Sequence, residues 1–131
     1  ARLLKPENET MGDRANVAVK AADDDIVFLY THNDGSALDE TLARALARRL
    51  RWNDPQYLAR IIFAEMTKGQ EAEETGYGIS AQIGDGDDRV WLVDVPAQTV
   101  TYCRWQGEPD AFTPRSPAQS FDDFLAMMVE G

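Results

Sequence analysis

The sequence is poor in the residue types that most often mark metal or redox chemistry. It has one cysteine, Cys103, and one histidine, His32, so no disulfide can form within the chain, and several thiolate or imidazole ligands cannot gather at one metal. No apolar run approaches the roughly 20 residues of a membrane-spanning helix, and no basic start followed by an apolar segment precedes the domain. We therefore expect a cytoplasmic protein without membrane contact, and we assign it no cofactor and no metal.

Basic residues are also scarce. The chain has 13 Lys and Arg against 23 Asp and Glu, a net charge of -10. Direct nucleic-acid binding is therefore not expected, because it needs clustered cations that release counterions from phosphates. Acids gather in three segments that are predicted to be turns or loops, residues 23–25, 71–74 and 85–88. Acidic turns are typical of solubility and edge protection, and a specific cation or partner site is the alternative.

The rest of the composition is that of one globular domain. A chain of 131 residues with 44% apolar and 27% charged residues has the size and balance of a single folded unit. Residues 1–10 combine Lys5 and Pro6 with polar neighbours and have no sustained period. We predict a flexible N-terminal arm or extension there and a single domain over residues 11–131.

Five segments have the short alternation or β-branched composition of strands: residues 16–20, 26–31, 77–83, 89–95 and 99–105. The first two predict a hairpin. The last three predict an antiparallel meander in which residues 84–88 form a hairpin loop. Residues 106–119 contain three prolines and are predicted to be a long loop.

Two consecutive helices are predicted between the second and third of these strands. Ser36 and Asp39 have the spacing of a capping box, and four leucines then form one apolar stripe, Leu38, Leu42, Leu46 and Leu50. Asp54 followed by Pro55 predicts the start of the second helix. Trp52 lies between the two helices and is expected to wedge them together.

A third helix is predicted at the end of the chain. Ser120 precedes it as an N-cap, and its apolar face comprises Phe121, Phe124, Leu125, Met128 and Val129. The element order is thus β-β-α-α-β-β-β-α. It predicts an α+β domain with a mostly antiparallel sheet of about five strands and three helices packed mainly on one face.

A local excess of arginine interrupts the acidic sequence. Within residues 44–60 five arginines accompany one acid, Asp54. Four of them form a candidate partner or anion patch: Arg44, Arg48, Arg49 and Arg51. Arginines near the end of a helix also suit the negative end of its dipole, so a solvated helix face is the alternative.

The turn His32, Asn33, Asp34 is the second candidate site. Histidine titrates near neutrality, and strand ends often hold catalytic groups. A metal site there would need further carboxylates, such as Asp54 or Glu65, brought close by folding. The other interpretation is a histidine that stabilises the turn.

Four strings of the sequence resemble a group of small proteins encoded by bacteria and their phages: residues 11–17, 30–35, 51–63 and 74–80. The similarity covers roughly residues 11–102, and a tryptophan often stands in that group where this chain has Asn33. The resemblance implies a self-contained domain with phage or prophage ancestry. It carries over no activity and no catalytic residue.

Two classes of function follow from these observations. The first is a non-catalytic, acidic interaction module, such as a phage-derived regulator or inhibitor of a host protein. The second is a small metal-assisted hydrolase or nuclease-like enzyme that uses His32 and nearby carboxylates. Self-association through a sheet edge or the apolar terminal helix is a further possibility.

Overall fold

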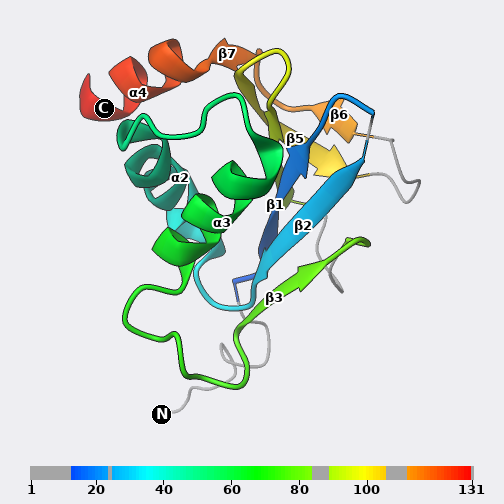
Figure 1. Cartoon of the computed structure of the whole chain (residues 1–131), viewed down its shortest axis with the longest axis vertical. Coiled ribbons are helices and arrows are strands. Elements are labelled where there is room, and N and C mark those ends of the chain that lie inside the picture. The colour runs from blue at the N-terminus through cyan, green and yellow to red at the C-terminus, as the bar shows by residue number, and fades with distance from the viewer. Residues whose placement is uncertain (1–12, 24, 84–88, 106–111, 131) are drawn as a thin grey trace.

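The computed structural model describes residues 13–23, 25–83, 89–105 and 112–130, without the side chain of residue 130. Figure 1 shows one curved sheet with helices gathered on one side of it. The predicted arm and the predicted hairpin loop at 84–88 lie outside the described residues. Among those residues, every helix is too short or too polar to cross a lipid bilayer.

The sheet has seven strands: β1 (Ala15–Lys20), β2 (Ile26–Thr31), β3 (Tyr77–Ser80), β4 (Arg89–Asp94), β5 (Thr99–Trp105), β6 (Phe112–Pro114) and β7 (Gln119–Ser120). Their order is β3-β2-β1-β4-β5-β6, and β7 also pairs with β5. β1 and β4 are parallel, and the other pairs are antiparallel. The α+β class and the mostly antiparallel sheet are confirmed.

The predicted opening hairpin is confirmed, because β1 pairs with β2 along its whole length. The predicted meander is confirmed in its second step, since β4 pairs antiparallel with β5, and wrong in its first, since β3 pairs with β2 rather than with β4. Burial explains the difference. β1 is buried on both faces over its first five residues, which is typical of a central strand, and it takes the place beside β4 that was predicted for β3. β3 carries small residues and the exposed Ile79, which suit an edge.

The predicted count of five strands is too low. β6 and β7 lie in the proline-containing segment that was expected to be a loop, and both pair with β5. They have three and two residues, which is too short for an alternating pattern to be visible in the sequence. Their position at the side of β5 also tolerates proline, because proline has no N–H to donate and an edge strand does not need every N–H for pairing.

The helices are η1 (Gly35–Ala37, a 3-10 turn), α2 (Leu38–Ala47), α3 (Pro55–Met66) and α4 (Phe121–Glu130). α3 begins as predicted, with the Asp54 carboxylate accepting from the N–H of Tyr57 at 3.3 Å. α4 does too, since the Ser120 hydroxyl accepts from the N–H of Asp123 at 3.0 Å. These two caps depend only on residues close in sequence.

The predicted start and end of α2 are wrong. Its N-cap residue is Ala37 and has no side-chain cap, because the Ser36 hydroxyl donates to the carboxylate of Asp13 instead. The helix ends at Ala47, so Leu50 lies beyond the apolar stripe and half of it is exposed. A partner distant in sequence thus displaces the local capping box.

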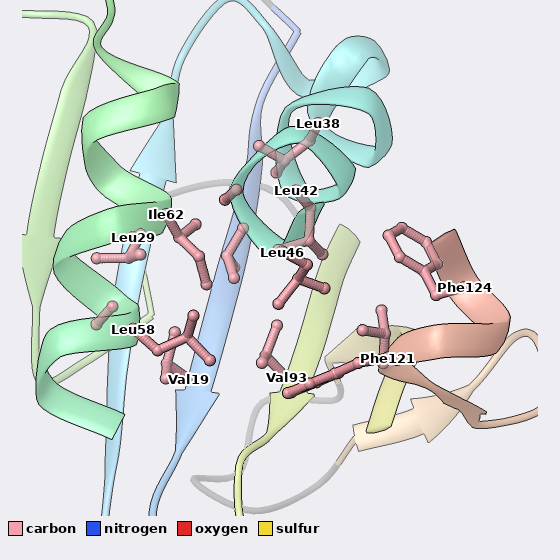
Figure 2. Packing of buried hydrophobic residues seen from close by; sticks show 14 of the residues in the cluster. Val19, Leu29, Leu38, Leu42, Leu46, Leu58, Ile62, Val93, Phe121 and Phe124 are labelled. Carbon is pink, nitrogen blue, oxygen red and sulfur yellow. The ribbon is translucent and has the colours of Figure 1, made fainter. Parts of the chain in front are cut away.

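The main core lies between the sheet and the helices (Figure 2). Leucines of α2 and Leu58 of α3 face the sheet where Val93 and Val19 lie, while Phe121 and Phe124 enter from α4. Each fully buried side chain of this size stabilises the fold by about 1.5–3 kcal/mol. The opposite face of the sheet holds a smaller cluster of Ala18, Phe28 and Val90, against which Ile26, Ile83, Leu92, Trp105 and Phe112 pack.

Candidate functional site

The turn after β2 is held by backbone hydrogen bonds at both ends. The N–H of His32 donates to Gly76 at 2.9 Å, and its carbonyl accepts from the N–H of Asp13 at 2.8 Å. The N–H of Asp34 donates to the Thr31 hydroxyl at 3.1 Å. Three separate segments of the chain therefore position this turn.

The side chains of the turn contact tyrosines. His32 Nδ1 lies 2.9 Å from the Tyr30 hydroxyl, and Asp34 accepts from the Tyr77 hydroxyl at 2.5 Å. Burial, with the nearby Asp34 carboxylate, raises the pKa of Tyr77 to about 12. Asn33 is exposed. His32 and Asp34 thus meet different partners, and each contact fixes one side of the turn.

The carboxylates expected to join His32 in a metal site lie elsewhere. Asp54 caps α3, and Glu65 contacts cations of α2. Within the part of the chain that the structure describes, no three His, Cys, Asp or Glu side chains are arranged to hold a metal ion. The enzyme hypothesis requires His32 and several carboxylates to meet at one place, and the described residues show no such group.

Asp13 organises this end of the sheet, although the sequence analysis did not single it out. Its carboxylate accepts from the N–H of Ser36 at 2.9 Å, from the Ser36 hydroxyl, and from Arg89 Nη2 at 2.9 Å. Burial acts to raise the pKa of Asp13, but these hydrogen bonds and the Arg89 charge outweigh it, so the pKa is lowered. Its carbonyl accepts from the N–H of Gly35 at 2.7 Å, and a Cβ on Gly35 would lie only 2.6 Å from that oxygen.

Two arginines of the candidate patch surround Glu65. Arg44 Nε lies 3.6 Å and Arg48 Nη1 3.8 Å from its carboxylate, and Lys68 Nζ lies 3.7 Å away. The Glu65 side chain is only 9% exposed. A carboxylate this deep needs nearby cations, so these contacts join α2 to α3.

The other two arginines also have acidic partners. Arg49 pairs with Asp122 of α4 at 2.8 Å and stands over the Trp52 ring. Arg51 lies 4.0 Å from Asp54. All four arginines of the patch therefore contact acidic side chains of the same chain, and the role of the patch as an anion or partner site stays a prediction.

Trp52 was predicted to wedge between α2 and α3, and its contacts are with α2 and α4. Its Nε1 donates to the carbonyl of Leu46 at 3.1 Å, at the end of α2. Its ring meets that of Phe121 edge-on, with centroids 5.1 Å apart. Trp52 therefore connects the α2–α3 corner to the start of α4, as a packing residue.

An open groove of about 690 Å3 lies between α2 and α4. We call it the α2–α4 groove, and its lining residues are Asp39, Glu40, Ala43, Arg44, Ala47, Leu125, Met127, Met128 and Val129. Met127 is 44% and Val129 86% exposed. The prediction that Val129 is part of the buried face is wrong. It lies in the last turn of α4, about 80° around the helix from Phe121 at 100° per residue, at the margin of the stripe.

No family model, curated protein or solved structure matches the chain. The functional proposal therefore depends on the geometry of the chain itself.

The structure brings some candidate residues together and separates others. His32, Asn33 and Asp34 form one turn beside Asp13, whereas the four arginines lie at the end of α2 and the corner after it. Asp13 could not be found from local sequence patterns, because its partners are 23 and 76 residues away. The groove could not be located either, although the apolar terminal helix was the signal for a contact surface on that side.

Proposed function

We propose that the protein is a non-catalytic interaction module that binds a protein partner through the α2–α4 groove. The observation that carries the proposal is the exposure of Met127 and Val129 beside an apolar groove. Grouped apolar side chains at the surface lose free energy in contact with water, and they commonly mark contact sites. Methionine suits such a surface because its flexible side chain adapts to a partner.

The form of the groove favours a protein over a small molecule. It is open rather than enclosed, whereas small-molecule sites bury most of their ligand. Its lining combines apolar residues, Ala43, Ala47, Leu125, Met127, Met128 and Val129, with the charged Asp39, Glu40 and Arg44. An apolar centre with a polar rim is the usual anatomy of a protein interface.

The contacts of the His32 turn support the non-catalytic part of the proposal. The Tyr30 hydroxyl meets the imidazole, and the Tyr77 hydroxyl meets the Asp34 carboxylate. We further propose that the module acts as a regulator or inhibitor of a host protein. That idea rests on the sequence resemblance to proteins of bacteria and their phages.

Affinity capture from a bacterial lysate with matched variants tests the proposal. Val129→Asp places a charge in the groove, and Leu50→Asp adds the same charge at a half-exposed position outside it. A protein captured by the wild type and by Leu50→Asp, whether a host protein or a second copy of this chain, but lost with Val129→Asp, is the expected result. Equal capture by Val129→Asp would contradict the groove as the contact surface.

The turn needs its own variant. His32→Ala removes the imidazole without touching the groove, so the same protein should still be captured. Loss of an enzymatic activity in His32→Ala, with folding and capture unchanged, would refute the non-catalytic assignment.

A further inference from the structure

We propose that the partner in the α2–α4 groove is a second copy of this chain, in a dimer with twofold symmetry. The inference rests on the proposed function, because it uses the same groove and names its occupant. It starts from the order of charged and small residues along α2.

Four groove residues lie on one face of α2. Glu40, Ala43, Arg44 and Ala47 have the spacing i, i+3, i+4, i+7, which aligns them along one side of a helix. Ala43 and Ala47 are small, so a second helix can approach this face closely. The two charges of opposite sign stand one turn apart, on either side of the middle of the helix.

This order is self-complementary. A twofold axis perpendicular to α2, close to Ala43, brings two α2 helices together antiparallel. Glu40 then lies opposite Arg44 of the second copy, and the symmetry repeats the pair in reverse. The Arg44 side chain is 56% exposed although its Nε faces Glu65 and its Nη2 donates to the Thr41 hydroxyl at 3.2 Å, so the exposed side of the guanidinium remains open to a carboxylate of the second copy.

The same axis relates the two α4 helices. In an isologous interface each patch meets its own copy, so Met127 and Val129 lose contact with water against the second chain. A stable interface buries roughly 800 Å2 per partner, about a tenth of the 7460 Å2 accessible surface of this chain. The outer faces of α2 and α4, two helices of ten residues each, would supply this surface.

Charge also favours this surface over the exposed ring of Tyr57. The net charge of -10 makes two copies repel each other, so they can associate only where opposite charges align. At Tyr57 the exposed ring lies under Arg51, 4.8 Å from its centroid, and a symmetric contact there would oppose two arginines. The groove instead presents Glu40 and Arg44 in reversible order, with Asp39 as a further acid beside them.

Sedimentation velocity on the purified chain, from low to high micromolar concentration, tests the dimer. The wild type and Leu50→Asp should sediment as dimers, whereas Val129→Asp should sediment as a monomer. Val129 is 86% exposed, so its substitution should leave the folded monomer intact, which circular dichroism checks.

Exchange of charges tests the arrangement. Glu40→Arg alone and Arg44→Glu alone should each be monomeric, because each opposes like charges at both contacts. An equimolar mixture of the two variants should recover a dimer, since both contacts then join opposite charges. Arg44→Glu also places a second carboxylate near Glu65. If the Arg44→Glu variant unfolds for this reason, the results for Glu40→Arg and Val129→Asp decide whether the dimer forms through this surface.

The outcomes separate this inference from the proposed function. A wild type that stays monomeric at every concentration, or a Val129→Asp variant that remains dimeric, overturns the dimer. If the wild type is monomeric but Val129→Asp still loses a captured partner, the interaction module stands with another occupant. Capture that is insensitive to Val129→Asp refutes the proposed function itself.

Discussion

Substitution of Asp13 should be the most informative single change at the end of the sheet. Its carboxylate joins β1, the turn after β2 and β4, because it accepts from Ser36 and from Arg89. Asp13→Ala removes all of these hydrogen bonds at once. It also leaves the Arg89 guanidinium, whose side chain is 28% exposed, without this carboxylate.

The expected size follows from the contacts. Hydrogen bonds to a charged group contribute about 1.5–3 kcal/mol when buried, and an exposed ion pair about 0–1 kcal/mol. The Asp13 side chain is 30% exposed, so the lower part of these ranges applies. We expect Asp13→Ala to lower the free energy of unfolding by about 2–3 kcal/mol and Ser36→Ala by about 0.5–1 kcal/mol. The double variant should resemble Asp13→Ala alone, because the Ser36 hydroxyl has then already lost its acceptor.

Urea unfolding followed by tryptophan fluorescence measures these differences. The pKa of Asp13 is lowered in the folded state, so its contribution is present above the unfolded value of 3.8 and is lost as the pH falls through the folded pKa. The difference between the wild type and Asp13→Ala should therefore shrink in acid. Strict additivity of the two substitutions, or a difference that is constant with pH, would refute this account.

Three other substitutions or probes test separate parts of the structure. The pKa of Tyr77 rises from 10.0 to about 12 on folding, so its contribution to the free energy of unfolding is present below pH 10.0 and is lost as the pH rises through about 12. Tyr77→Phe should lack this alkaline loss of stability. A Tyr77→Phe variant with the same alkaline profile as the wild type in urea unfolding would contradict this. Burial raises the pKa of the Cys103 thiol to about 11, so a thiol reagent should label the chain only after unfolding, and rapid labelling of the native protein would show that the thiol is accessible. Phe124→Ala should lower the free energy of unfolding by about 3–5 kcal/mol, because Phe124 is fully buried against Trp91. A decrease below about 1 kcal/mol in urea unfolding would mean that α4 is not docked as described.

Local features of the fold could be predicted because their causes are local. The caps at Asp54 and Ser120 each bond a backbone N–H three residues later, and the β1–β2 hairpin joins neighbouring segments. The positions of β3 and β4 could not be predicted in the same way. Alternation shows that a segment is a strand, but the choice of neighbour depends on which faces become buried in the whole sheet.

The candidate site shows the same division. The sequence locates the His32 turn and the arginines of α2, but it cannot show that Tyr77 and Glu65 engage them. Ser36 is the clearest example, since its spacing to Asp39 satisfies a local rule while its hydroxyl bonds to Asp13. A long-range acceptor with three hydrogen-bond donors around it outweighs a local cap of about 1 kcal/mol.

The parallel pairing of β1 with β4 has a consequence for synthesis on the ribosome. β1 is among the first described residues to emerge, yet its register pairs Asn16 with Val90 and Lys20 with Asp94. The hairpin, α2 and α3 therefore leave the ribosome with one side of β1 still unpaired. Folding cannot be completed until residue 94 is outside the exit tunnel, and closing so long a loop slows the final step. A nascent chain stopped before β4 would expose the unpaired backbone edge of β1 and incompletely covered apolar side chains on its faces, and it should be a target for chaperones.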